Sequence, residues 1–336
     1  MATIKQVAER AGVSTATVSY VLNGTGSVTA ATRRRVLEAV EALSYQPNHA
    51  ARSLRTRSRT LGLVLPVSAA GLGDPALAEL VAGAAECAAG RGYYLLLASV
   101  ASGQQEDELE TRLAASGRVD GIILLDLRTD DERPARLAAA GVPFVGAGAS
   151  GRAGEARLVG FAMYHGAVDA TRHLLALGHR RIGMIALPSD RLDSEPFYQG
   201  FADALGAVGL EPDPVLIVEA GTAEDDGIAA MQELLAAPER PSAVIAASDA
   251  LAFGAMHALR DAGLEAGREL SIVGCGDLPL AAHSHPPLTT LRAPRRALGA
   301  ELARRLVALV EREPLPEPTT LALQLIVRRS TAPPER

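Results

Sequence analysis

The sequence has few cysteines and lacks several common motifs of catalytic and metal sites. Cys87 and Cys275 are the only cysteines among 336 residues, and they lie far apart in apolar surroundings. The seven histidines are scattered, and no GxxxxGKS/T, HExxH or GxSxG motif occurs. These absences favour reduced, buried thiols over disulfides, and they do not support catalysis. We therefore predict that the protein is not an enzyme and that it binds no metal and no cofactor.

Long apolar runs are also missing. The chain has no stretch of about 18 uninterrupted apolar residues and no secretory-type run near its N-terminus, so we expect a cytoplasmic protein. A hydrophobic content of 48% is enough for more than one core. The dinucleotide-like string GAGASG at 146–151 precedes a predicted strand rather than a helix, so the helix N-terminus that would hold a phosphate is missing.

The first 43 residues carry the pattern of three short helices. Thr3, Ser14 and Thr29 can each cap a helix through the side-chain hydroxyl, and Gly12 permits a sharp turn between the first two helices. Apolar residues recur at helical spacing, at Ile4, Val7, Ala8 and Ala11, at Val18, Val21 and Leu22, and at Val36, Leu37, Val40 and Leu43. Two helices around a glycine turn are typical of a helix-turn-helix, although they also occur in unrelated proteins.

Charge is divided unevenly between this segment and the rest of the chain. Residues 1–60 contain nine Lys and Arg against three Glu, a net charge of +6, whereas the whole chain carries −6 and the remainder therefore −12. A basic N-terminal segment on an acidic body is the electrostatic pattern of a nucleic-acid-binding module attached to a separate module. The alternative is a solvated basic tail, which the capped, periodic helices disfavour.

After residue 60 the pattern changes to short apolar runs that alternate with helical stretches rich in Ala and Leu, such as 76–90 and 165–177. This alternation predicts parallel sheets covered by helices on both faces, and the chain is too long for one such sheet. The predicted strands lie within 61–67, 93–100, 121–127, 142–148, 156–162, 181–187, 214–220, 242–248 and 270–276.

Two motifs in the N-terminal segment are more specific than periodicity. TIKQVAERAGVSTATVSYVLN at 3–23 and YQPNHAARSL at 45–54 resemble the headpiece and hinge of the lactose-repressor (LacI/GalR) family. The remainder is similar to the sensing core of that family, through VDGIIL at 119–124, GHRRIGMI at 178–185 and PPLTTLRAPRRALG at 286–299. The resemblance covers essentially the whole chain.

The resemblance implies an all-α helix-turn-helix headpiece followed by an α/β core of two periplasmic-binding-protein-like subdomains with parallel sheets. We expect the DNA-binding domain at 1–46, a hinge helix and linker at 47–59, and an effector-binding and dimerisation core at 60–336. The N-subdomain would comprise about 60–160 and 291–322, and the C-subdomain about 161–290 and 323–336. The expected activity is that of a dimeric repressor of pseudo-palindromic operator DNA, controlled by a small molecule.

The resemblance also assigns roles to residues of the headpiece and hinge. Tyr20 stands where relatives commonly carry Arg, which puts guanine recognition there in doubt, and packing on the sugar-phosphate backbone is its alternative role. Leu54 matches a residue that wedges into the minor groove, and dimer packing is its alternative. The base-reading residues would be Thr15, Ala16 and Tyr20, the minor-groove residues Leu54, Arg55 and Ala51, and the phosphate contacts Thr3, Ser14, Thr17, Ser19, Asn23, Thr32, Tyr45 and Asn48.

The expected effector cleft keeps few of the polar residues with which relatives bind sugars. Phe197 stands where an Arg is usual, Gly276 where the first of two Asp is expected, and Ala293 where Gln is frequent. The cleft residues implied by the resemblance are Ala76, Phe161, Phe197, Tyr198, Asp249, Gly276, Asp277 and Ala293. Because no arginine falls on these positions, unpaired sugar hydroxyls would be costly there, and a free hexose is disfavoured. The alternative to an effector site is a cleft closed by its own side chains, in a DNA-binding regulator without a small-molecule effector. The alternative to a DNA-binding regulator is a solute-binding or metabolic protein without specific DNA binding.

Overall fold

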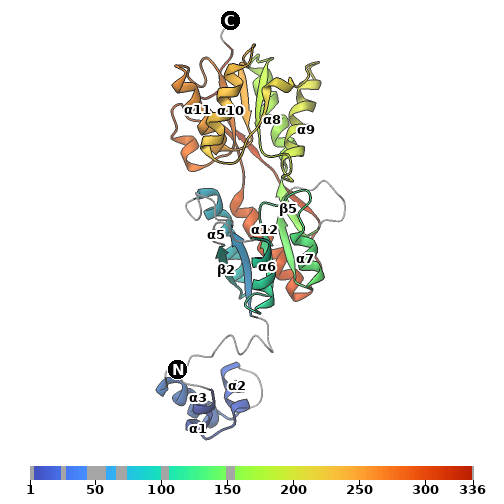
Figure 1. Ribbon diagram of the computed structural model, residues 1–336. Coiled ribbons are helices and arrows are strands. Elements are labelled where there is room, and N and C mark those ends of the chain that lie inside the picture. The colour runs from blue at the N-terminus through green and yellow to red at the C-terminus, as the bar shows by residue number, and fades with distance from the viewer. Residues whose placement is uncertain are drawn as a thin grey trace. The chain divides into compact units, whose positions relative to one another are not determined.

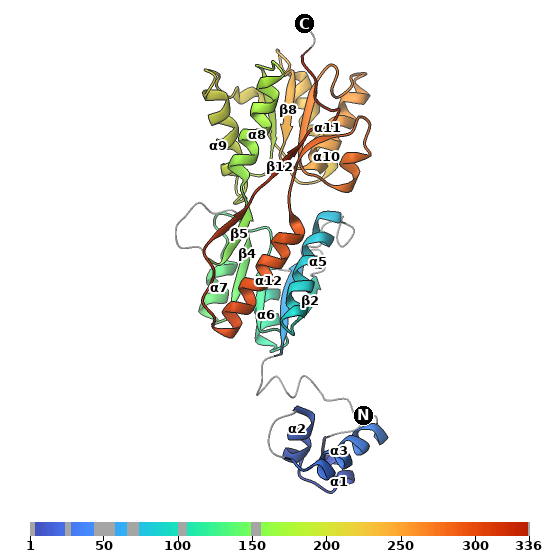
Figure 2. The same cartoon turned by 180° about the vertical axis from the view of Figure 1, so that it is seen from behind.

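The computed structural model describes residues 4–23, 28–43, 58–65, 74–99, 106–148 and 156–334 (Figures 1 and 2). The chain divides into two compact units, 1–58 and 59–336, which are described separately. Among the described residues, no helix is both long enough and apolar enough to cross a membrane.

The described residues of the first unit form three helices, α1 (Ile4–Ala11), α2 (Thr15–Asn23) and α3 (Ala30–Ala42). Two of the predicted caps are confirmed, because the Thr17 amide donates to Ser14 Oγ at 3.1 Å and the Thr32 amide donates to Thr29 Oγ1 at 3.3 Å. Gly12 adopts a φ of +63°, the left-handed conformation that favours glycine in this turn. These local signals fix where the helices begin and how the first two are joined.

The core of this unit is built from Val7, Ala8, Ala11, Val18, Val21, Val36 and Ala39. One predicted core residue is wrong, because Leu37 is 50% exposed. Val36 is fully buried, and one residue further along a helix turns the side chain by about 100°. Ala39, three residues after Val36, takes the inward position instead.

In the part of the second unit that the structure describes, there are two six-stranded sheets, each at the centre of one subdomain. The N-subdomain sheet has the order β11-β5-β4-β3-β1-β2 and is parallel throughout. Its strands are β1 (Thr60–Leu65), β2 (Tyr94–Ser99), β3 (Gly121–Leu124), β4 (Phe144–Ala147), β5 (Leu158–Phe161) and β11 (Thr319–Leu321). The covering helices are α5 (Pro75–Gly90), α6 (Glu106–Ala115), α7 (Arg133–Ala139) and α12 (Arg295–Glu311).

The C-subdomain sheet has the order β12-β10-β9-β8-β6-β7. Its strands are β6 (Ile182–Ala186), β7 (Ile217–Glu219), β8 (Ala243–Ala246), β9 (Ser271–Gly276), β10 (Thr289–Arg292) and β12 (Gln324–Ile326). Its helices are α8 (Met163–Ala176), α9 (Ser194–Gly206), α10 (Glu224–Ala236) and α11 (Asp249–Asp261), with short 3-10 turns at Pro214–Leu216 and Pro279–Ala282.

Alternation along the strands creates a core on each face of both sheets. In β1, Leu61, Leu63 and Leu65 pack with residues of α5 and α12, whereas Val64 packs on the opposite face with residues of α6 and α7. In the C-subdomain, α8 and α9 cover one face and α10 and α11 the other, as Figures 1 and 2 show. The chain crosses between the subdomains three times, after β5, after β10 and after β11.

Each of the nine predicted stretches overlaps a strand, but three further strands were not predicted. β10, β11 and β12 contain Thr, Arg or Gln in short segments, so they lack the apolar runs that mark the other strands. β12 also pairs antiparallel with β10, which makes the second sheet mixed rather than fully parallel. The prediction of two buried thiols is confirmed for Cys275 and is wrong for Cys87, which is half-buried; both are free.

A fully buried arginine joins distant parts of the N-subdomain. The Arg305 guanidinium pairs with Glu301 at 2.6 Å and donates to the carbonyl oxygens of Ala156, Pro316 and Glu317. A buried cation needs such a set of acceptors, since an unpaired charge would be costly there. Arg305 therefore ties the start of β5 and the segment before β11 to helix α12.

A candidate nucleic-acid interface and a candidate ligand cleft

The outer face of α2 presents polar and small side chains to solvent. Thr15 and Ala16 are exposed and Tyr20 is 49% exposed, whereas Val18 and Val21 on the opposite side are buried. Helical periodicity thus places the three predicted base-reading residues on one accessible surface. A helix with such a face fits the width of a DNA major groove, where hydroxyl and methyl groups read base edges.

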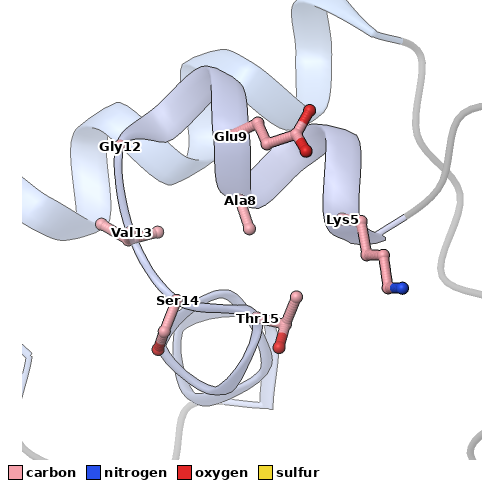
Figure 3. Close-up of a pocket in the computed structure, with 7 residues that line it drawn as sticks. All are labelled: Lys5, Ala8, Glu9, Gly12, Val13, Ser14 and Thr15. Carbon is pink, nitrogen blue, oxygen red and sulfur yellow. The ribbon is translucent and has the colours of Figure 1, made fainter.

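A shallow pocket adjoins this face at the turn between α1 and α2 (Figure 3). It is lined by Lys5, Ala8, Glu9, Gly12, Val13, Ser14 and Thr15. Figure 3 shows Lys5 of α1 and Thr15 of α2 on opposite sides of this hollow. Lys5 and the hydroxyls of Ser14 and Thr15 suit a phosphate group, whereas the Glu9 carboxylate in the same pocket opposes one.

Of the eight predicted phosphate contacts, four have side chains that the structure describes and four do not. Three of the hydroxyls, those of Ser14, Thr17 and Thr32, also serve the fold, because Thr17 Oγ1 lies 2.9 Å from Ser14 Oγ and Thr32 Oγ1 lies 2.9 Å from Thr29 Oγ1. Ser14 is exposed, whereas Thr17, Ser19 and Thr32 are half-buried. The side chains of Thr3, Asn23, Tyr45 and Asn48, and the predicted minor-groove residues Ala51, Leu54 and Arg55, lie outside the described residues.

In the core, seven of the eight predicted cleft residues form two groups, of which one, Asp249, Gly276 and Asp277, lies at or just after the carboxyl ends of β8 and β9. Phe161, Phe197, Tyr198 and Ala293 belong to or pack against one apolar cluster that includes Cys275, next to Gly276. Phe197 is only 2% exposed and Ala293 only 6%, so both are covered in this structure. Burial raises the pKa of the Cys275 thiol to about 12, which leaves it protonated and unreactive at neutral pH. Ala76, near the start of α5, has no contact with the other seven among the described interactions.

The two carboxylates among the predicted cleft residues, Asp249 and Asp277, already have hydrogen-bond or ion-pair partners within the protein. Asp249 is 1% exposed, and it accepts from Thr290 Oγ1 at 2.5 Å and from the Leu278 amide at 2.6 Å. Burial raises the pKa of Asp249, and these two hydrogen bonds oppose that rise. The carboxylate oxygens of Asp249 are therefore satisfied before any ligand arrives.

Asp277 is held in the same way by two cations. Its carboxylate lies 2.6 Å from both the Arg292 and the Arg328 guanidinium groups. Burial opposes ionisation, but the hydrogen bonds from Arg328 and Arg292 prevail and hold the pKa of Asp277 below its usual value. Its backbone has a φ of +54°, a left-handed conformation that Asp tolerates better than most residues. Asp277 is a fixed, ionised group rather than a free ligand.

The sequence analysis missed three arginines at this site: Arg292 and Arg328 pair with Asp277, and the third, Arg295, contacts Gly276. Its Nη1 donates to the Gly276 carbonyl oxygen at 2.5 Å, and its Nη2 lies 2.7 Å from the position that a Cβ on Gly276 would occupy. The expectation of a cleft without arginine is therefore wrong. Arg295 comes from the first turn of α12 in the N-subdomain, two residues after Ala293. An arginine at a helix N-terminus opposes the helix dipole, and this is the signal that could have identified it.

Comparison with known proteins agrees with this architecture. Residues 3–48 match the family described as bacterial regulatory proteins, lacI family, and residues 171–331 match the periplasmic binding protein-like domain. The HTH-type transcriptional regulator CelR of Thermobifida fusca is 38% identical over 334 residues, which cover 98% of this chain and 98% of CelR. Similarity thus extends over both units.

Two solved structures are similar over almost the entire chain. The complex of the transcriptional regulator CelR with cellobiose is 37% identical, with a TM-score of 0.75, and covers 98% of this chain and 100% of that one. The lac repressor dimer bound to operator and the anti-inducer ONPF is 29% identical, with a TM-score of 0.85, and covers 98% of this chain and 99% of that one.

Proposed function

This chain belongs to the LacI family of bacterial DNA-binding transcriptional regulators. On that premise we propose that it is a cytoplasmic, dimeric repressor that binds pseudo-palindromic operator DNA. The observation that carries the proposal is the exposed face of α2, with Thr15, Ala16 and Tyr20 directed away from a buried apolar stripe. Membership of the family disfavours a solute-binding or metabolic protein without specific DNA binding.

Base recognition in this proposal differs from recognition by arginine. Thr15 offers a hydroxyl or a methyl group, Ala16 offers a methyl group to thymine, and Tyr20 offers a phenolic hydroxyl. Phosphate contacts from the basic headpiece would supply most of the affinity, and these three residues the sequence preference. The hinge residues Ala51, Leu54 and Arg55 would bend the operator by wedging its central step from the minor groove.

A salt titration tests this division of labour. We expect the affinity for the operator to fall steeply between about 50 and 200 mM salt, because each neutralised phosphate releases counterions. Scrambled DNA of the same length should bind more weakly by roughly a thousandfold or more at moderate salt. A flat salt dependence, or equal affinity for operator and scrambled DNA, would contradict the proposal.

A small-molecule effector in the cleft is the second part of the proposal. Phe161 and Tyr198 are half-buried beside the apolar cluster, while both carboxylates are already bonded. This lining favours a flat, apolar or aromatic molecule over a free hexose, because burial of apolar area is the main gain available. CelR is similar and has been solved with cellobiose, so a disaccharide belongs in any test set.

The burial of these residues also favours a second candidate function, a repressor whose cleft stays closed and which has no small-molecule effector. Phe197 and Ala293 are covered, and Arg295 already donates to the Gly276 carbonyl oxygen. Both candidates share operator binding, and they differ in whether any ligand stabilises the folded core.

A further inference from the structure

Two loops from different subdomains lie side by side at the junction of the core. Loop 126–131 follows β3 of the N-subdomain, and loop 188–194 follows β6 of the C-subdomain. Arg128 and Arg191 form an antiparallel bridge between them. The Thr129 amide donates to the Asp190 carbonyl oxygen at 2.8 Å, and the Leu192 amide donates to the Leu127 carbonyl oxygen at 3.3 Å. The backbones of the two subdomains are thus hydrogen-bonded through two loops that are separate in sequence from the three peptide crossovers.

The side chains on this bridge are charged in a reciprocal pattern. Arg128 of the first loop pairs with Asp190 of the second, and Arg191 of the second loop pairs with Asp126 of the first at 3.0 Å. Each loop therefore contributes one cation and one anion. Exposed pairs of this kind contribute little singly, but here two pairs flank two backbone hydrogen bonds and fix the same register.

An apolar contact lies at the centre of the bridge. Leu192 comes from the C-subdomain loop but packs against the N-subdomain cluster that contains Leu127 and Leu158. Its Cδ1 lies 3.0 Å from the position that a Cβ on Gly148 would occupy, so the absence of a side chain at residue 148 leaves room for it. Burial of Leu192 between the subdomains adds a stabilising term that salt does not screen.

Both loops are shaped by contacts within their own subdomains. The Arg133 guanidinium donates to the carbonyl oxygens of Leu125 and Asp126 and pairs with Asp131 at 2.7 Å, which supports the first loop. In the second loop, Ser194 Oγ donates to the Pro188 carbonyl oxygen at 2.7 Å. Preformed loops lose little conformational entropy when they meet.

We propose that loops 126–131 and 188–194 form a latch that holds the two subdomains together in the absence of any ligand. The latch is a fourth connection between the subdomains, in addition to the three peptide crossovers. A ligand shifts an equilibrium only if it binds the two states with different affinity. An effector that binds the latched state more tightly therefore stabilises the latch, and an effector that binds the unlatched state more tightly opens it. This proposal does not depend on operator binding.

Hydrogen exchange on the full-length, ligand-free protein tests the latch directly. The amides of Thr129 and Leu192 should be protected in the wild type, because their acceptors lie on the other loop. Asp190→Arg should accelerate exchange of both amides by about threefold to tenfold, since it replaces an ion pair with a repulsion beside Arg128. The double variant Arg128→Asp with Asp190→Arg exchanges the two charges of the ion pair, and it should restore most of the protection of the Thr129 and Leu192 amides.

A matched control uses the ion pair between Arg181 and Asp213, at 2.9 Å, which lies within the C-subdomain alone. Asp213→Arg should leave exchange at Thr129 and Leu192 unchanged. Leu192→Ser provides a second test, and it should accelerate exchange of the Thr129 amide. The latch is refuted if both amides exchange freely in the wild type, or if neither Asp190→Arg nor Leu192→Ser accelerates the Thr129 amide.

Discussion

At the scale of single residues, His179 shows how a buried polar group ties the end of the chain to the core. The ring is 1% exposed, with Nδ1 2.9 Å from Ser242 Oγ and Nε2 2.9 Å from the Ala332 carbonyl oxygen. Because a carbonyl oxygen only accepts, Nε2 carries the proton of the neutral ring. Burial lowers the pKa of His179, and this effect outweighs the hydrogen bond to Ala332.

This environment predicts a dependence of stability on pH. Below about pH 6.5 the unfolded chain binds a proton at His179 that the folded chain binds less readily, so the free energy of unfolding should fall as the pH falls. His173, whose pKa burial also lowers, acts in the same direction. His179→Asn should cost about 1–3 kcal/mol at neutral pH through lost hydrogen bonds and should reduce the pH dependence.

Urea unfolding at several pH values between about 5 and 8 measures both effects. The comparison of wild type with His179→Asn isolates this residue, because His173 is common to both proteins. A variant that loses no stability, or that keeps the full pH dependence of the wild type, would show that His179 does not act as described.

At the scale of elements, the close packing of α5 on α12 depends on two glycines. A Cβ on Gly83 would lie 1.9 Å from the Arg296 carbonyl oxygen, and a Cβ on Gly299 would lie 1.9 Å from the Leu80 carbonyl oxygen. Both obstacles are backbone atoms, which cannot move without shifting a helix. The two helices carry the apolar residues that cover one face of the N-subdomain sheet.

Gly83→Ala should therefore destabilise the core by about 1–3 kcal/mol, the usual cost of overpacking. Gly90→Ala on the same helix is the matched control, since nothing lies within 4 Å of the position that its Cβ would occupy, and it should be neutral or stabilising by up to about 1 kcal/mol. Denaturant midpoints compare the two variants. Equal effects of the two substitutions would mean that the helices do not approach as closely as the structure has them.

The sequence predicted elements better than it predicted contacts. Caps at Ser14 and Thr29 and nine apolar runs located helices and strands, because these signals are local. The polar strand β10 and the exposure of Leu37 were missed, since each depends on what packs against it. Arg295 and the latch were not predicted either, because their partners lie 19 to more than 60 residues away and no periodicity links them.

At the scale of the whole molecule, the remaining question is whether the cleft binds a ligand. A ligand that binds only the folded state raises the melting temperature, so a thermal-shift panel distinguishes the two candidate functions. We expect an aromatic or apolar metabolite to stabilise the protein more than glucose, with cellobiose included for comparison with CelR. Strong stabilisation by a free hexose would contradict the apolar cleft, and no response across a broad panel would favour the closed cleft.

Operator recognition by the headpiece is the central claim, and the most direct test is selection of genomic DNA fragments by the purified full-length protein. The account predicts enrichment of a pseudo-palindrome with half-sites about one helical turn apart. Tyr20→Ala should relax the preference at one position of each half-site, and Leu54→Ala should lower specific affinity by about 1–3 kcal/mol or more without unfolding the protein. The account would be contradicted by fragments that share no two-fold motif, by a motif that Tyr20→Ala leaves unchanged, or by wild-type specific affinity of the Leu54→Ala protein.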